Sequence, residues 1–382
     1  MTDHAPATRP LRIATRPPRT RLDQWPRRRP RRWLLRALFA LPFVVFAIVV
    51  HLLGVTTSPN IRLVERAAEI PWDRADAIWL GEIFPPISTL LAAFAPGGSL
   101  TLSLLGAISA GIFLQKIIEI MVQRRFPRST IIILMSALAL NPLFFYNATQ
   151  NFAAFLGLLL FGLGLSHIVR FVAWGNTESG FRVGLYFMVA VLTDITALVY
   201  VTAAAVSAPF LTHRRSQEKG VRRANALVIL YPAAAALLSL IVLNAVFLGS
   251  PFSSAMRTAF AEFGDRLVVA LTFLTTFEGM WVIAPVVSAW LIAIIVRRPG
   301  AIIISSLVFV AIILGFALGL LPEGSTGNTF ITMTLMAIAL IPTARSRKTT
   351  TLIDLVSVLQ FVIAWAAALT STALAAWASQ IL

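Results

Sequence analysis

The chain has 382 residues, of which 58% are hydrophobic and 13% are charged, and its net charge is +16. This composition excludes a soluble globular domain, and because the apolar residues fall in blocks of about 20 it predicts helices that cross a membrane. The absence of cysteine excludes disulfides and cysteine metal sites. The four scattered histidines do not predict a histidine metal cluster.

The positive charge is concentrated near the N-terminus, where eleven arginines lie between Arg9 and Arg36. Most other basic residues flank apolar blocks, which is typical of cytoplasmic loops, so we expect no nucleic-acid partner. Residues 1–32 are rich in Arg and Pro and are predicted to form a disordered cytoplasmic tail that contacts anionic lipids. The long basic region without a small-residue cleavage site argues against a signal peptide.

The first span is predicted from about Trp33 to Val55, with its basic start on the inside. Residues 56–98 then form an outer loop with short helices, the last of which begins near Phe84 and ends at the break Pro96-Gly97-Gly98. A second outer segment is predicted over 249–266. The remaining apolar blocks lie at 100–122, 130–143, 152–172, 183–212, 225–248, 276–296, 301–321, 329–343 and 352–377.

The block over 183–212 is basic on both sides, so the positive-inside rule predicts a hairpin of two short helices with an outer turn near Asp194–Thr196. With this hairpin every basic cluster falls on the inside. These clusters lie at 124–128, 213–223, 297–298 and 345–348. The predicted fold class is therefore an all-α polytopic membrane protein. Residues 33–382 form one transmembrane domain of about eleven helices in the plasma (inner) membrane, with the N-terminus cytoplasmic and the C-terminus outside.

The first outer loop concentrates acids in a chain that has only 16 of them. Asp73 and Asp76 are three residues apart and would share one face of a helix, and Glu82 follows them. Such carboxylates can act as a general base on a sugar hydroxyl, or can hold a divalent cation, Mg or Mn, against a phosphate. Trp72 and Trp79 could stack on the sugar. The alternative interpretation is a solvated amphipathic helix whose tryptophans belong to the aromatic belt of the interface.

Asp194 is an acid within an apolar hairpin, which makes it a candidate binding residue. The alternative interpretation is that it caps a helix at the wet outer turn, beside Thr193 and Thr196. Glu278 and Arg257 lie in or near the outer segments and are candidates for binding an anionic lipid phosphate.

Four stretches occur in a suggestive order. Gly81–Leu91 contains Phe84-Pro85-Pro86 followed by two leucines, and Asn141–Asn147 precedes a span. The short hairpin over 183–212 comes next, and Tyr231–Phe252 is a span that ends in a pattern of Asn, Gly, Pro and Phe. In this order the stretches resemble the GT-C superfamily of polyprenyl-phosphate-sugar-dependent membrane glycosyltransferases.

The resemblance implies a GT-C-like bundle that transfers a sugar from a polyprenyl-phosphate donor, with an acid of the first outer loop as the catalytic base. Asp73 is the expected base, Asp76 is the second choice and Glu82 is a supporting ligand. In many members this acid follows the first span immediately, whereas Val55–Asn60 contains none. Many members also carry a soluble outer domain after the last span, which we do not expect here, so the acceptor surface would be minimal or supplied by a partner.

Two other functions stay open at this point. The chain could be a non-catalytic membrane subunit that scaffolds a complex with a membrane-protein partner, or a transporter of a lipid-linked substrate. The low number of charges within the predicted spans argues against ion-coupled transport.

Overall fold

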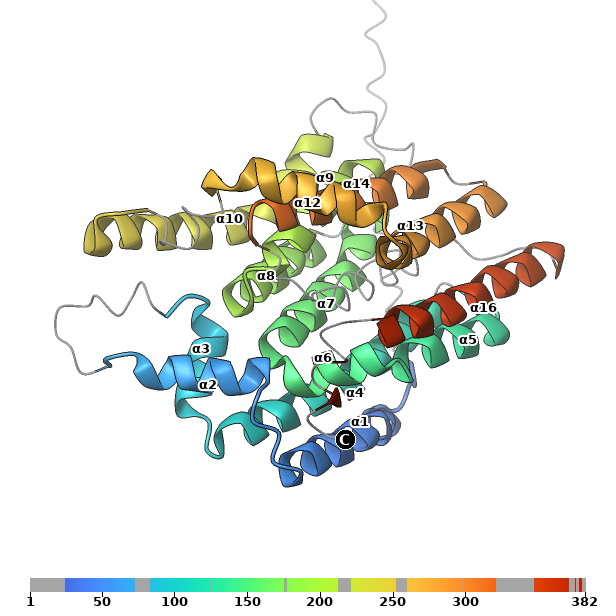
Figure 1. Ribbon diagram of the computed structural model, residues 1–382. Coiled ribbons are helices and arrows are strands. Elements are labelled where there is room, and N and C mark those ends of the chain that lie inside the picture. The colour runs from blue at the N-terminus through green and yellow to red at the C-terminus, as the bar shows by residue number, and fades with distance from the viewer. Residues whose placement is uncertain are drawn as a thin grey trace, which may run out of the picture.

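The computed structural model describes residues 25–72, 83–123, 125–174, 177–211, 221–251, 260–297, 299–320 and 347–370, together with Ala375 and 378–379. These residues form helices joined by turns and contain no β-strand (Figure 1). The helices are α1 (Arg29–Leu52), α2 (Pro59–Glu69), α3 (Pro86–Phe94), α4 (Gly98–Gln123), α5 (Arg128–Ala139), α6 (Pro142–Gln150), α7 (Phe152–Trp174), α8 (Thr177–Thr193), α9 (Ala197–Leu211), α10 (Val221–Leu248), α12 (Phe263–Leu274), α13 (Phe277–Ile295), α14 (Pro299–Ala317) and α16 (Arg347–Thr370).

Helices α1, α4, α10 and α16 are long and apolar enough to cross a membrane. Helices α5 and α6 together also qualify, although they are bent by 56° at their junction. Shorter apolar helices lie at 152–168, 197–207, 283–295 and 302–317. The described chain is therefore helical and membrane-embedded, while the total of about eleven spans and their sidedness stay predictions. The predicted span over 329–343 lies outside the described residues.

The bend between α5 and α6 follows from the pair Asn141-Pro142. Proline has no backbone N–H to donate and fixes its own φ, so it begins a new helix more readily than it continues an old one. The Asn141 side chain caps this new helix, since its Oδ1 accepts a hydrogen bond from the Leu143 backbone N–H at 2.8 Å. The predicted single span over 130–143 is therefore the first half of a longer bent pair.

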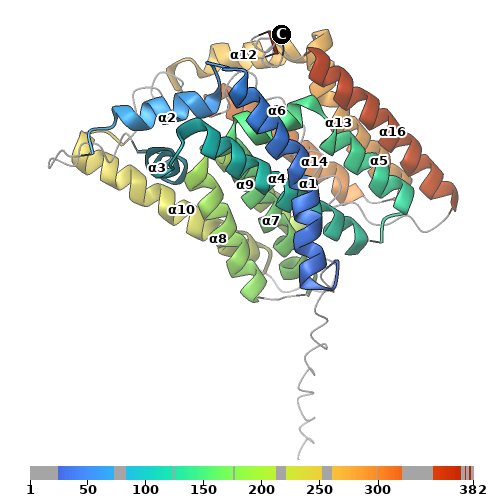
Figure 2. The same cartoon turned by 90° about the horizontal axis from the view of Figure 1, so that it is seen from below.

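The core of the bundle is built around α7, which packs against α4, α6, α8 and α9 (Figures 1 and 2). Phe155 of α7 makes edge-on contacts with Phe144 at 5.4 Å and with Phe113 at 5.8 Å between ring centroids. Further along α7, Phe161 stacks on Phe187 of α8 at 5.5 Å. These aromatic contacts tie helices that lie far apart in the sequence into one apolar core.

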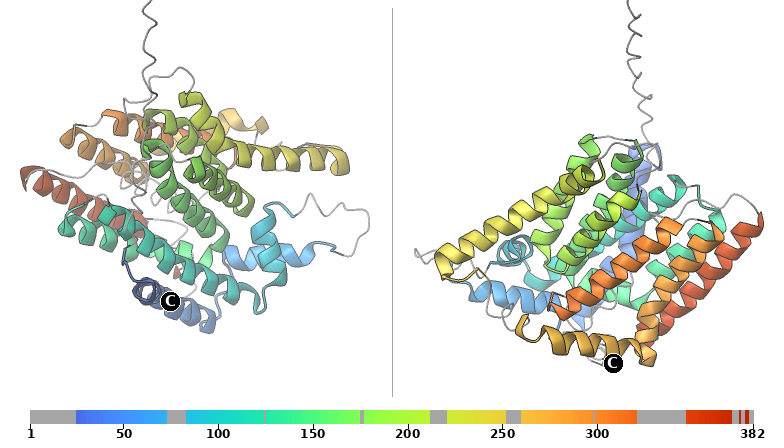
Figure 3. Two further views of the ribbon diagram at one scale, coloured as in Figure 1. Left: turned by 180° about the vertical axis from the view of Figure 1, so that it is seen from behind. Right: turned by 90° about the horizontal axis from the view of Figure 1, so that it is seen from above.

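Close helix contacts depend on small residues, as is common where helices associate in a membrane. A Cβ atom at Gly111 of α4 would lie 2.3 Å from the backbone oxygen of Arg36 in α1. A Cβ atom at Gly184 of α8 would lie 2.6 Å from Cγ of Pro232 in α10. These glycines let α1 and α10 approach the bundle, and beyond its contact with α8 and α9 helix α10 projects past the rest of the molecule (Figure 3).

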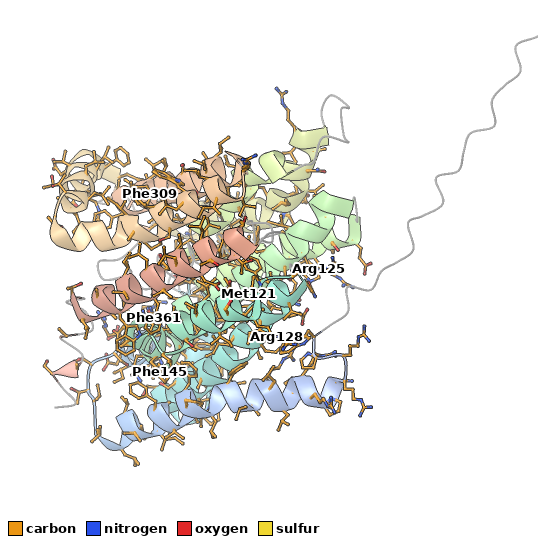
Figure 4. The ribbon with its side chains drawn as sticks, turned by 90° about the vertical axis from the view of Figure 1, so that its right-hand side faces the viewer. Met121, Arg125, Arg128, Phe145, Phe309 and Phe361 are labelled. Atoms are coloured by element: carbon orange, nitrogen blue, oxygen red, sulfur yellow. The ribbon has the colours of Figure 1, made fainter. Side chains whose placement is uncertain are left out.

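The two ends of the bundle are formed by different residues and different helices. Helix α1 begins where α4 ends and α5 begins, and Arg125 and Arg128 lie toward this end while Phe145 lies toward the other (Figure 4). We call the former the basic end. The opposite end is formed by α2, α3, the α6–α7 junction and the α8–α9 turn, and we call it the α2 end.

The structure confirms the predicted break at 194–196, because α8 ends at Thr193 and α9 begins at Ala197. It also confirms a short helix, α3, that ends just before Pro96. It differs at the second outer segment, where α12 begins at Phe263 and continues to Leu274, across the line of the long helices (Figure 2). Helix α12 was not predicted, because its first residues fall in the predicted outer segment over 249–266 and its other residues precede the span predicted over 276–296.

A polar contact joins helix α16 to helix α5, which precedes it by more than 200 residues in the sequence. Asp354 accepts hydrogen bonds from the Ser129 hydroxyl at 2.5 Å and from the Thr130 hydroxyl, both in the first turn of α5. Elsewhere on α16, Gln360 is 6% exposed, and neither its Nε2 nor its Oε1 has a hydrogen-bond partner within the described part of the chain.

Replacing Gln360 by leucine should stabilise the protein by about 1 kcal/mol, because it removes a buried amide whose polar atoms are unsatisfied. The measurement is the thermal unfolding midpoint in detergent, followed by tryptophan fluorescence. Gln115→Leu is the matched control, since Gln115 is also a buried glutamine in a long helix but is fully hydrogen-bonded, and it should lower the midpoint. A lower midpoint for Gln360→Leu would contradict the prediction.

Candidate functional site

Helix α2 starts and ends for local reasons. Ser58 caps it by accepting a hydrogen bond from the Ile61 backbone N–H at 3.2 Å, and Pro59 occupies the first turn. The helix has one polar and one apolar face, and Ala67 on the apolar face is completely buried. It lies against α3 and α4 at the α2 end (Figure 2), and its charged side chains are exposed.

Asn60 anchors α2 to the bundle. It is 1% exposed, and its Nδ2 donates to Ser103 Oγ of α4 at 3.1 Å and to the Thr149 backbone oxygen of α6 at 3.0 Å. Its Oδ1 accepts a hydrogen bond from the Phe152 backbone N–H at 2.8 Å, which is one of the otherwise unpaired donors at the start of α7. One amide therefore satisfies polar groups on three helices and fixes the position of α2.

Buried polar side chains gather at this end. More than half of those among the described residues come from α2, α3, the start of α4, the α5–α6–α7 junctions and the α8–α9 turn. They are Ser58, Asn60, Ser88, Thr89, Ser103, Asn141, Asn147, Thr149, Gln150, Thr193 and Thr196. Because polar groups are costly inside a membrane, such a concentration marks a structural or functional feature of this end.

Arg66 lies one helical turn after Arg62 on α2. Its Nη2 donates to Thr89 Oγ1 of α3 at 2.8 Å, which directs the guanidinium over the α2–α3 contact. Neighbouring atoms lower the pKa of the Arg66 guanidinium by partial desolvation, although the residue as a whole is exposed, and an arginine remains protonated at neutral pH. No carboxylate in the described ranges forms an ion pair with it. An exposed guanidinium that is oriented by a hydrogen bond and has no counter-charge is suited to binding an anion such as a phosphate.

Asp194 lies in the turn between α8 and α9. Its Oδ1 accepts a hydrogen bond from the Thr196 backbone N–H at 3.2 Å, and its Oδ2 accepts one from the Thr196 hydroxyl. Its Cβ packs against α7 at Gly157, which is five residues or about 7.5 Å along the helix axis from the Phe152 contact with Asn60. The capping bonds expected for Asp194 are present, and the binding role stays a prediction.

Trp72 is the one aromatic residue of the predicted sugar site that the structure describes. Its Nε1 donates to the Ala67 backbone oxygen at 3.1 Å, and its ring lies 5.6 Å from that of Phe94. The indole is therefore folded back over the α2–α3 pair.

The other predicted site residues cannot be placed. Asp73, Asp76, Trp79, Glu82 and Arg257 lie outside the described residues, as does the side chain of Glu278, whose backbone belongs to the first turn of α13. Within the described ranges no three His, Asp or Glu side chains are grouped so that they could hold a metal ion.

Sequence reasoning overlooked Asn60 and Arg66, which form hydrogen bonds between helices at this end. Arg62 and Arg66 are four residues apart in an amphipathic segment, and that spacing indicates two cations on one helix face. No comparable signal pointed to Asn60, because its three partners are 43 to 92 residues away in the sequence.

No family model, curated protein or solved structure matches the chain.

Proposed function

We propose that the protein is a plasma-membrane glycosyltransferase that moves a sugar from a polyprenyl-phosphate donor to an acceptor hydroxyl at the α2 end. The observation that carries this proposal is Arg66, an exposed cation that is oriented by a hydrogen bond to Thr89 and has no described counter-charge. A lipid phosphate at the membrane surface would supply the missing negative charge. The acid-rich segment that contains Asp73 follows the same helix in the sequence.

In the proposed reaction Asp73 takes the proton from the acceptor hydroxyl, and the oxygen attacks the anomeric carbon of the sugar. The bond from that carbon to the phosphate oxygen breaks, and the polyprenyl phosphate leaves with the bonding electrons. Arg66 stabilises the charge that develops on the phosphate. Asp76 is the alternative base and Glu82 a supporting group.

Arg66→Gln should weaken the binding of geranyl phosphate about tenfold, or ~1.4 kcal/mol, because a charge-assisted contact to phosphate is lost. Binding is measured by microscale thermophoresis on the purified protein. Arg182→Gln is the control, since Arg182 is exposed and is paired with Glu178 at 2.6 Å. Equal affinity of Arg66→Gln and the unmodified protein for geranyl phosphate would contradict a role of Arg66 in binding. Sugar transfer by the double variant Asp73→Asn, Asp76→Asn would contradict the assignment of these acids as the base.

A second candidate function is a non-catalytic membrane subunit, and one observation favours it. Asn60 lies in the stretch directly after α1, where the resembling family usually has its acid, and its amide is fully used in structural hydrogen bonds. A subunit of this kind would co-purify with a membrane-protein partner in mild detergent at constant stoichiometry. It would also keep its cellular role in the Asp73→Asn, Asp76→Asn double variant, which the transferase would lose.

A further inference from the structure

Helix α1 has two different faces. One face packs on the bundle through Ala40, Phe43, Ala47 and Val50. The other face is exposed through Leu34, Leu38, Leu41, Val45 and Ile48. The exposed residues recur every three or four positions, so they form one continuous apolar stripe along the helix, and in a membrane-embedded protein this stripe faces lipid.

At the basic end of the bundle, exposed arginines precede the apolar stripe. Arg31 precedes Leu34 by three residues and lies in line with the stripe, and Arg28 is the residue directly before the first turn of α1. Arg28, Arg29 and Arg31 are exposed, and their side chains form no ion pair or hydrogen bond with any described residue. Trp33 is 52% exposed beside them, as is typical of an indole at a membrane interface.

This cationic segment is held in place by a buried glutamine of α4. Gln115 is 0% exposed, and its Nε2 donates to the Trp25 backbone oxygen at 2.7 Å while its Oε1 accepts a hydrogen bond from Arg36 Nε at 3.0 Å. The two partners lie on either side of the start of α1. Gln115 therefore binds the segment 25–36 at two points and holds it against α4.

Two further sets of contacts support the hydrogen bonds of Gln115 to the segment 25–36. Glu119, also buried, accepts hydrogen bonds from Gln115 Nε2 at 3.2 Å and from Lys116 Nζ at 2.7 Å, so the carboxylate is compensated within α4. Arg32 donates to the backbone oxygens of Pro26 and Arg27, both at 3.2 Å. Arg32 is thereby used within the segment, whereas Arg28 and Arg31 are left for a partner.

We propose that this face of α1 is a binding site for an anionic phospholipid. Arg28 and Arg31 bind the headgroup phosphate, and the acyl chains lie along Leu34, Leu38 and Leu41. The occupant is assigned by charge complementarity at one end of the stripe and by apolar surface along the rest, a combination that a phospholipid matches in one molecule. The site lies at the end opposite Arg66 and does not depend on the proposed transferase activity.

The test compares phosphatidylglycerol with phosphatidylcholine, added to the full-length protein in mild detergent. The readouts are the thermal unfolding midpoint and the number of bound lipids by native mass spectrometry. Phosphatidylglycerol should raise the midpoint and remain bound, and Arg28→Gln with Arg31→Gln should weaken its binding at least about tenfold. Arg182→Gln is the control for loss of an exposed positive charge. All variants keep residues 1–24, so the charge of that segment is constant.

Equal phosphatidylglycerol binding by the double variant and the unmodified protein would overturn the site, as would an equal loss in Arg182→Gln. The same stabilisation by inorganic phosphate would show that a lipid is not required and would also overturn it. A stable dimer that dissociates on Leu38→Glu, without any effect of phosphatidylglycerol, would assign the face to a second copy of the chain instead. Gln115→Leu leaves both arginines in place and should reduce lipid retention through misplacement of the segment. If Gln115→Leu does not fold, the arginine variants still decide the outcome.

Discussion

Asn60→Leu is expected to destabilise the protein by about 3 kcal/mol or more, because it leaves buried polar groups on three helices without partners. The groups that lose their partners are the Ser103 hydroxyl, the Thr149 backbone oxygen and the Phe152 backbone N–H. Leucine keeps the branching of asparagine at Cγ but is larger, so overpacking at this buried position adds to the loss of the hydrogen bonds. The thermal unfolding midpoint in detergent is the measurement.

The control for Asn60→Leu is Glu65→Gln, which changes an exposed residue of the same helix and should leave the midpoint nearly unchanged. A small effect of Asn60→Leu, similar to that of the control, would contradict the anchoring role. Asn60→Leu should also weaken geranyl phosphate binding, because Arg66 is carried by the helix that Asn60 holds. A variant that is destabilised but binds geranyl phosphate normally would separate the anchor from the proposed site.

Gly106→Ala is expected to be strongly destabilising, although alanine normally stabilises a helix relative to glycine by about 0.8–1.0 kcal/mol. A Cβ atom at Gly106 of α4 would lie 2.0 Å from the backbone oxygen of Ala148 in α6. Because this oxygen belongs to the backbone, no side-chain rotation can relieve the overlap, and α4 and α6 must separate. Forcing such a shift in a packed core costs about 1–3 kcal/mol or more.

The matched control is Gly264→Ala in the first turn of α12, where a Cβ atom would meet nothing within 4 Å. Gly264→Ala should be neutral or slightly stabilising, so the two identical substitutions should have opposite signs. The comparison is made on thermal unfolding midpoints in one detergent. A neutral Gly106→Ala would mean that the α4–α6 contact is looser than the structure has it, and the neighbouring Asn60 bonds to α4 and α6 would then also come into question.

Asn60 and Gly106 illustrate why part of the α2 end was not predictable from the sequence. Gly106 and Gly111 lie in one apolar run, and nothing local indicates that the first meets the backbone of α6 and the second the backbone of α1. Asn60 is a common first-turn residue after a Ser-Pro start, and its role depends on partners in α4, α6 and α7. The expected acids of the first outer loop, Asp73 and Asp76, lie outside the described residues and stay predictions.

What the sequence determined by itself are features with a local physical cause. Blocks of about 20 apolar residues require helices in a membrane, since each helix satisfies its own backbone hydrogen bonds. The helix break at Asp194–Thr196 follows from residues that cap a helix nearby. The break at Asn141-Pro142 has an equally local cause, although the predicted span ran across it to 143.

Only the tertiary structure decided how identical residue types differ in role. Gln115 is bound by partners from the start of α1, whereas Gln360 on an equally buried helix face has none among the described residues. Arg66 is oriented by Thr89 of a neighbouring helix. Arg31 is exposed, and the residues on either side of it, Trp25 and Arg36, are hydrogen-bonded to Gln115 of α4. Such roles depend on contacts across tens to hundreds of residues, and the local sequence does not encode which helix will lie opposite.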